Sequence, residues 1–246
     1  KKSINKLPKN IKKKIFVEKN KVTTRKKRFV DVAYSKKISE VYYIDDDFLN
    51  ELNSFKIKNY LSKNLKNFDV VIMIDYGHGF MNQDIYKILQ KKSKFLAINC
   101  QSNSANLGFN LITKYKKSHY VCIDEPELRL ATSNNKDEIK KIVINQLSKK
   151  INFKNITITQ GKNGCTSFFK SRMLNTPALI SDKVIDTIGA GDVFMAITSL
   201  LYSKKTDQLT TSLIGNIAGA LKVDILGHSK SISKSNFYSV LNHILK

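Results

Sequence analysis

Four short apolar segments recur along the middle of the chain, at residues 70–75, 95–99, 120–125 and 156–160. Their hydrophobicity is continuous rather than alternating, which is typical of strands that are buried on both faces. Stretches with helical spacing, at residues 84–92, 105–117 and 136–149, lie between them. This alternation predicts an α/β fold with three layers, in which helices cover both faces of a mainly parallel sheet.

The first part of the chain has a different pattern. Short segments rich in β-branched and aromatic residues, at 14–18, 27–32 and 39–44, are separated by charged runs and predict strands of a small exposed sheet. We therefore expect residues 1–47 to form a β lid with its connection, and residues 48–246 to form a single α/β core. Apolar lid residues would leave one face uncovered, which predicts a homodimer through the lids. These residues are Phe29, Val41, Tyr42 and Tyr43.

Polar residues lie where the predicted core strands end. In an open parallel sheet, ligands bind outside the carboxyl ends of the strands. The residues expected at this edge are Asp75, Asn99, Asp124, Glu127, Thr159 and Gly161.

A glycine-rich turn with a carboxylate lies farther along, in the sequence DTIGAGD at residues 186–192, and the apolar stretch VFMAITSLLY follows it. A Gly-Ala-Gly turn that opens a helix presents free backbone amides at the positive end of the helix dipole, which is an anion site. Asp192 would lie beside a bound phosphate, where its natural role is to accept a proton from an attacking hydroxyl. The alternative is an acidic residue that only favours the helix N-terminus.

The DTIGAGD string resembles the second signature of the PfkB (ribokinase-like) carbohydrate kinases, and other segments match this family in order. The sequence TQGKNG at 159–164 resembles its nucleotide loop, and DEPE at 124–127 resembles its N-x-x-E motif, with Asp124 in place of Asn. The resemblance implies a ribokinase-like fold and an ATP- and Mg²⁺-dependent phosphotransfer to a sugar or sugar-phosphate hydroxyl. In this interpretation Asp192 is the general base, the amides of Gly189, Ala190 and Gly191 form the anion hole, and Glu127 and Asp124 hold the metal.

The same resemblance assigns the nucleotide site. Its residues are Thr159, Gly161, Gly164, Asp186, Thr187, Asn216 and Gly227. In related kinases, the residues around Asp186 and the loop near Gly227 can enclose a monovalent cation such as K⁺. A backbone-capping role for Asp186 stays open as the alternative.

The heptose-phosphate kinase branch, which forms the sugar-kinase half of ADP-heptose synthesis enzymes, is the most similar. VVIMIDYGHG at 70–79 is similar to its D-Y-G-K-G strand end, and VTTRKKR at 22–28 is similar to its T-T-x-K-x-R lid segment. The predicted sugar-binding residues are Asp75, Gly77, Lys26, Arg28 and Asn99. The family's N-terminal G-G signature has no counterpart before residue 14, so the chain resembles the family without its N-terminal part. This keeps open a catalytically impaired homologue that binds a nucleotide or a partner.

The amino-acid composition bears on nucleic-acid binding, membrane insertion and the state of the cysteines. With 43 Lys and Arg against 20 Asp and Glu, the formal net charge is +23. Nearly all the basic residues are lysines spread along the whole chain, and arginine clusters and aromatic platforms for nucleic acid are missing from the sequence. No apolar run approaches the length of a membrane span. The three cysteines show no C-x-x-C spacing, which is typical of reduced thiols in a cytoplasmic protein.

Overall fold

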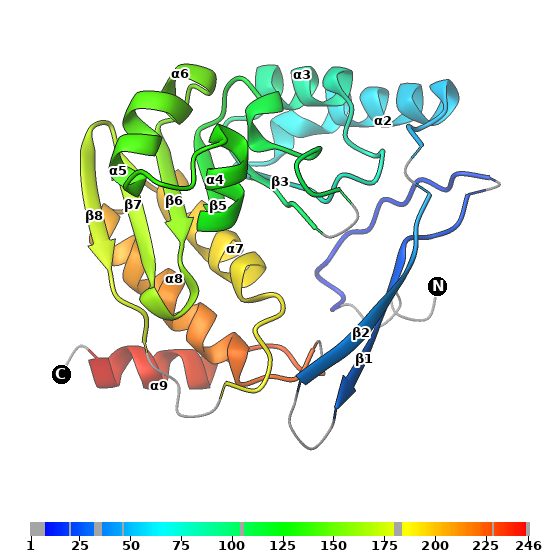
Figure 1. Ribbon diagram of the computed structural model, residues 1–246. Helices are drawn as coiled ribbons and strands as arrows, with labels where there is room; N and C mark the ends of the chain where they lie inside the picture. Colours follow the sequence, from blue (N-terminus) through cyan, green and yellow to red (C-terminus); the bar gives the residue numbers. More distant parts are fainter. Residues whose placement is uncertain are drawn as a thin grey trace.

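A computed structural model describes residues 8–19, 21–31, 36–45, 47–103, 106–179, 184–227 and 229–244 (Figure 1). Its central sheet has six strands in the order β3-β4-β5-β6-β7-β8. The strands β3 to β6 run parallel, whereas β7 and β8 are antiparallel additions at one edge. The bounds are Val71–Asp75 for β3, Leu96–Cys100 for β4, Tyr120–Asp124 for β5, Asn155–Thr159 for β6, Cys165–Phe169 for β7 and Arg172–Thr176 for β8. The predicted core strands and the mainly parallel sheet are confirmed.

Helices cover both faces of this sheet, as expected of a three-layer α/β fold (Figure 1). One face is covered by α2 (Glu51–Asn64), α3 (Gln83–Lys92), α4 (Glu125–Thr132) and the consecutive helices α5 (Ile139–Ile142), η3 (Val143–Leu147) and α6 (Ser148–Lys150). The other face is covered by α7 (Ala190–Ser203) and α8 (Gln208–Val223), and α9 (Lys234–Ile244) packs against α8. Short 3-10 turns are η1 (Leu65–Asn67), η2 (Ile112–Lys114) and η4 (Gly161–Asn163). None of the described helices is long and apolar enough to cross a membrane.

Successive strand residues supply the two cores, because side chains alternate between the faces of a sheet. In β5, Val121 and Ile123 pack into the core beneath α2 to α5, whereas Tyr120 and Cys122 pack beneath α7. The hydroxyl of Tyr120 bonds to Thr198 of α7 at 3.0 Å. This continuous apolar character explains why the segment is recognisable in the sequence as a strand buried on both faces.

The lid is a two-stranded antiparallel sheet of β1 (Arg25–Asp31) and β2 (Lys36–Tyr43), which stands apart from the central sheet in Figure 1. Two of the three predicted lid strands are therefore confirmed. The third, at residues 14–18, is wrong, because this segment is held by helix α2 rather than by a neighbouring strand. Asn53 donates to the carbonyl of Val17 at 3.1 Å, and Glu18 accepts from the Asn50 amide at 3.1 Å.

The helix predicted at residues 105–117 is also wrong over its described residues, which form turns and the short η2. Asparagine side chains take over the backbone bonds that a helix would make. Asn106 accepts from the Asn103 amide at 2.9 Å, and Asn110 donates to the Gln101 carbonyl at 3.0 Å and the Asp75 carbonyl at 3.1 Å. This loop therefore packs under the end of β3 instead of crossing the sheet.

Candidate active site

A cleft of about 1600 Å³ opens at the carboxyl ends of the parallel strands, and the inner face of the lid contributes to its lining. Fifteen of the residues selected from the sequence line it. They are Lys26, Arg28, Asp75, Asn99, Asp124, Glu127, Thr159, Gly161, Gly164, Thr187, Gly189, Ala190, Gly191, Asp192 and Asn216. Three others, Gly77, Asp186 and Gly227, are not among the lining residues. The fold therefore brings segments more than 150 residues apart in the sequence to one cleft.

The N-terminus of α7 forms the predicted anion site. Gly189 is the N-cap residue, with a left-handed φ of 80°, and no described side chain caps this helix. The amide of Ala190 donates to the Thr187 carbonyl at 3.3 Å, but the amides of Gly191 and Asp192 donate to no described group and remain available to a ligand, and the helix dipole favours an anion there. Asp192 lies in this first turn, is half-buried and lines the cleft. The backbone can thus bind a phosphoryl group directly beside a carboxylate.

Tyr76, at the end of β3, contacts this carboxylate from across the cleft. Burial together with the Asp192 charge raises the pKa of Tyr76. The tyrosine therefore remains neutral beside Asp192. The segment VVIMIDYGHG contains this tyrosine, but the sequence does not reveal its role, because its proximity to residue 192 arises only when the strands assemble.

Two further carboxylates lie where β5 passes into α4. Asp124 accepts from the Glu127 amide at 2.7 Å, and Glu127 accepts from the Asp124 amide at 3.0 Å, so the pair forms a capping box. Burial, reinforced by the Asp124 charge, raises the pKa of Glu127 to about 7. Burial also raises the pKa of Asp124. Neither carboxylate takes part in an ion pair among the described residues, so the negative charge of both would be stabilised by a cation.

A metal ion at this position would need ligands from outside the protein. Among the described residues, no group of three or more His, Cys, Asp or Glu side chains is arranged to hold a metal ion. Mg²⁺ typically binds through one or two carboxylates together with water and phosphate oxygens. Both Glu127 oxygens accept backbone amides, from Ser102 and Asp124 at 3.0 Å, so the pair fits a Mg²⁺ ion that arrives with a nucleotide phosphate and is contacted through its water ligands.

The predicted nucleotide loop follows β6. Gly161 to Asn163 form η4, and the chain then reverses at Gly164, whose φ is 85°. A side chain at Gly164 would lie 2.1 Å from the carbonyl oxygen of Thr176, so only glycine fits this turn. Asn216 of α8 donates to the carbonyls of Thr176 at 3.2 Å and Pro177 at 2.8 Å. Asn216 therefore fixes the segment after β8 that forms this side of the cleft.

Asp75 lies at the cleft floor, but its carboxylate is engaged within the protein. It is 4% exposed and accepts from the Tyr115 hydroxyl at 2.7 Å, from the Lys114 ammonium and from the Gly77 amide at 2.9 Å. Burial alone would raise the pKa of Asp75, but these hydrogen bonds outweigh it and hold the pKa below its usual range. Gly77 has a left-handed φ of 73°, and a side chain there would collide with Asn106. Both residues thus fix the strand end.

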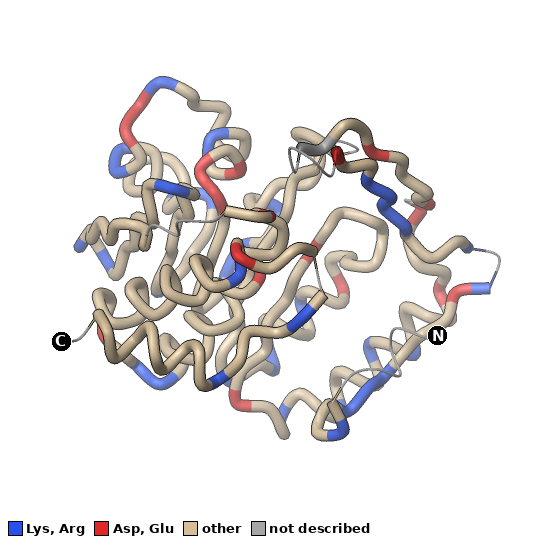
Figure 2. The backbone as a smooth tube through the Cα atoms, turned by 90° about the horizontal axis from the view of Figure 1, so that it is seen from below, with Lys and Arg blue, Asp and Glu red and all other residues tan. Residues whose placement is uncertain are grey.

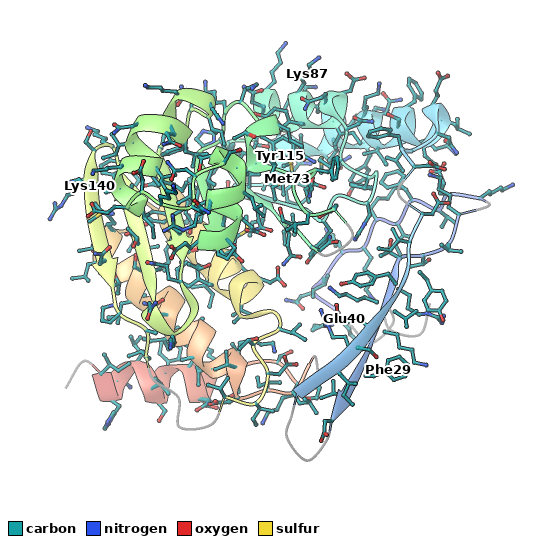
Figure 3. All side chains as sticks on the ribbon, in the orientation of Figure 1. Phe29, Glu40, Met73, Lys87, Tyr115 and Lys140 are labelled. Atoms are coloured by element: carbon teal, nitrogen blue, oxygen red, sulfur yellow. The ribbon has the colours of Figure 1, made fainter. Side chains whose placement is uncertain are left out.

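The inner face of the lid carries a basic pair that Glu40 holds in place. Glu40 lies opposite Arg28 in the β1-β2 register and binds its guanidinium at 2.6 Å, and the Lys26 ammonium lies 3.5 Å away. Figure 3 shows Glu40 on the side of the lid facing the core and Phe29 on the opposite side. Tyr42, expected on the uncovered face, instead donates to Glu40 and lines the cleft. Sequence reasoning missed Glu40, although strand alternation places it on the same face as Lys26.

Asp186 and Gly227 lie behind the anion site. Asp186 accepts from the Ile188 amide at 3.0 Å and from the Gly227 amide at 2.8 Å. Both carboxylate oxygens therefore hold backbone, which is the capping role that the sequence analysis left open. The bond to Ile188 fixes the turn that leads into Gly189 and α7.

Comparison with known proteins agrees with this geometry. The model of the pfkB carbohydrate kinase family matches residues 21–234. The bifunctional protein HldE of Aliarcobacter butzleri is 26% identical over 219 residues, which are 87% of this chain but 44% of that protein. The chain thus spans less than half the length of these curated relatives.

Solved structures show the same fold at low identity. Ribokinase of Arabidopsis thaliana, in complex with ribose and ATP, has a TM-score of 0.65 at 14% identity over 90% of this chain and 70% of that one. Phosphofructokinase-2 of Escherichia coli, in complex with potassium, has a TM-score of 0.67 at 12% identity over 85% and 67% of the two chains. With a family match across most of its length, the chain belongs to the pfkB carbohydrate kinase family and has a ribokinase-like fold.

Proposed function

We propose that this chain transfers the terminal phosphoryl group of ATP to a hydroxyl group of a sugar or a sugar phosphate. The observation that carries this proposal is the position of Asp192, in the first turn of α7 beside the open amides that follow Gly189. The same cleft holds the strand-end carboxylates of Asp124 and Glu127 and the basic lid residues. Phosphoryl transfer requires a base, an anion site, a metal site and a lid over the substrate.

In the proposed reaction, Asp192 accepts the proton of the sugar hydroxyl as the hydroxyl oxygen bonds to the γ-phosphorus. The bond from this phosphorus to the β,γ-bridging oxygen breaks, and ADP leaves with the electron pair. The amides of Gly189, Ala190 and Gly191 stabilise the charge on the transferred group, because they are oriented before the reaction begins. The Tyr76 hydroxyl would donate to Asp192 and position it.

Glu127 and Asp124 would hold Mg²⁺, which neutralises phosphate charge when bound. The raised pKa values of both carboxylates support this assignment, since a nearby cation removes the cause of the shift. For K⁺, the residues Asp186 and Gly227 already bond to each other, so the assignment of a free monovalent cation there has less support.

The nucleotide would lie along Thr159, Gly161, Gly164, Thr187 and Asn216, all of which line the cleft. Lys26, Arg28 and Asn99 line the same cleft and would contact the sugar, and Asp75 with Gly77 would shape its floor. The paired lid cations would suit a phosphorylated sugar. Together with the HldE relatives, they support a heptose phosphate as the substrate.

The division into a lid at 1–47 and a core at 48–246 belongs to the same proposal. The outer lid face exposes Phe29, Val41 and Tyr43 by 43%, 40% and 45%, which supports pairing of two lids in a homodimer. The three cysteines are free and buried, which supports a reducing compartment such as the cytoplasm.

The test is kinase turnover by the purified chain, with Mg·ATP and a panel of sugars and sugar phosphates, followed as ADP release. Asp192→Asn is expected to lower kcat by about 10² to 10⁴ while Mg·ATP binding is retained. Asp84→Asn is the matched control, because Asp84 is also an acidic residue in a first helical turn, that of α3, but its side chain is exposed and does not line the cleft. A loss below about tenfold in Asp192→Asn would remove the base assignment. Binding of Mg·ATP without turnover by the wild type would favour the nucleotide-binding module instead.

A further inference from the structure

A lysine ammonium is buried behind the anion site. Lys222, in the last turn of α8, is only 5% exposed. Its ammonium donates to the carbonyl oxygen of Gly227 at 2.9 Å and to that of Ile225 at 3.3 Å. A buried charge is costly unless polar groups compensate it, and carbonyl groups at the C-terminus of a helix carry the favourable partial charge. The loop after α8 is therefore folded around this cation.

The loop connects the ammonium to the turn before α7. Gly227 is held from two sides, because its carbonyl binds Lys222 and its amide donates to Asp186 at 2.8 Å. The other oxygen of Asp186 accepts from the Ile188 amide at 3.0 Å, next to the N-cap Gly189. The carbonyl of Val223, adjacent to Lys222, accepts from the amides of Ile185 at 2.9 Å and Asp186 at 3.0 Å. Hydrogen bonds and short stretches of backbone thus connect Lys222 to the turn that precedes the anion site.

The family resemblance predicts a monovalent cation between Asp186 and the Gly227 loop, and the solved phosphofructokinase-2 structure was determined with potassium. In this chain a described cationic group already binds one carbonyl oxygen of that loop. The Gly227 carbonyl is bound by the ammonium, and both Asp186 oxygens are bound by amides. The described residues therefore fit a free K⁺ ion poorly.

We propose that the Lys222 ammonium is a built-in replacement for this monovalent cation. It is bonded to the loop carbonyl and it braces the turn that carries the anion site. Because the ammonium is covalently part of the chain, it does not dissociate from the site when the salt concentration is lowered. A dissociable cation would stabilise the fold in proportion to the logarithm of its concentration, whereas a tethered one gives no such dependence.

The test compares thermal unfolding in KCl and in tetramethylammonium chloride at equal ionic strength. Tetramethylammonium lacks N–H donors and is too large for a site that an ammonium fills. We expect the Tm of the wild type to be the same in both salts. Lys222→Ala should unfold at a lower temperature in tetramethylammonium chloride, and KCl or ammonium chloride should restore part of its Tm.

Lys222→Met retains most of the side-chain volume without the charge, so it separates the loss of the ammonium from the loss of packing. It should also have a lowered Tm, but KCl should restore it less because the side chain still fills the space. Lys140→Ala is the control, since Lys140 lies exposed on α5 (Figure 3), and its Tm should match the wild type in every salt.

A wild-type Tm that rises specifically with KCl would overturn the proposal, because the site would then still bind the free ion. The proposal would also be overturned if both Lys222 variants had the same Tm as the wild type in tetramethylammonium chloride. These readouts need no turnover, so they stand if the proposed kinase activity fails. Where turnover is found, the wild-type kcat should be equal in both salts, and Lys222→Ala should lose about tenfold, or about 1.4 kcal/mol, in tetramethylammonium chloride.

Discussion

Replacing Tyr115 by phenylalanine removes one oxygen atom from the core and deprives the buried carboxylate of Asp75 of one donor. The hydroxyl lies 2.7 Å from the carboxylate, a distance typical of a charge-assisted hydrogen bond. Asp75 is 4% exposed and Tyr115 is 1% exposed, so water cannot take the place of the hydroxyl. Hydrogen bonds to charged groups are worth about 1.5–3 kcal/mol, and the Lys114 and Gly77 donors remain. We therefore expect Tyr115→Phe to lower the free energy of unfolding by about 2 kcal/mol at neutral pH.

This loss should depend on pH in a defined direction. The pKa of Asp75 lies below its usual range in the folded protein, so the ionised carboxylate contributes stability above the unfolded pKa. That contribution is lost as the pH falls through the folded pKa. Without the Tyr115 hydroxyl, the folded pKa of Asp75 rises. The difference between wild type and variant is then largest near pH 7 and narrows as the pH falls below about 4, through the folded pKa values.

Urea unfolding at several pH values measures this difference. With a slope of about 2 kcal/mol per molar urea, the expected midpoint shift near neutral pH is about 1 M. Tyr86→Phe is a matched control, because the two rings lie 4.7 Å apart and the Tyr86 hydroxyl bonds to the backbone of Lys117 instead of a carboxylate. It should cost about 1 kcal/mol at every pH in this range. A loss in Tyr115→Phe that is equally independent of pH would refute the charged hydrogen bond.

Two further predictions concern packing and assembly. Gly215→Ala should destabilise the fold by about 1–3 kcal/mol in thermal unfolding, because the new methyl group would lie 2.5 Å from the Phe194 ring where α7 packs on α8. Gly219→Ala, on the same helix but facing open space, should instead gain up to about 1 kcal/mol, and equal effects in both variants would contradict the packing argument. The lid dimer predicts a molecular mass of two chains by light scattering at micromolar concentration, and Val41→Asp on the outer lid face should halve it. A monomeric wild type would contradict the dimer, and Val17→Asp, on an exposed residue outside the lid strands, should leave the mass unchanged.

The sheet could be predicted from the sequence because its strands are buried on both faces and are therefore continuous in hydrophobicity. Residues such as Val121 and Cys122 face opposite cores, but both are apolar. The antiparallel strands β7 and β8 were not predicted, since Cys165–Phe169 mixes threonine and serine with apolar residues. The helix expected at 105–117 failed because helical spacing of apolar residues does not reveal that asparagine side chains take the backbone partners.

The candidate site could be predicted where its function resides in backbone conformation. The Gly-Ala-Gly turn and Gly164 need glycine or small residues for steric reasons, and such positions are visible in a sequence. Contacts between distant segments were not visible. Tyr76 and Asp192 are 116 positions apart in the sequence, and Lys222 is one lysine among many until its burial is known.

The charge of the chain can now be assigned to parts of the molecule. Of the 43 Lys and Arg residues, the described lining of the cleft includes only Lys26, Arg28, Arg129 and Lys162. Three of these bind carboxylates, at Glu40 or Glu125, so much of their charge is balanced locally. Figure 2 shows the remaining described basic residues distributed over many elements rather than gathered at one surface. An anionic ligand in the cleft would therefore depend chiefly on the amides at the N-terminus of α7, which the net charge of +23 does not describe.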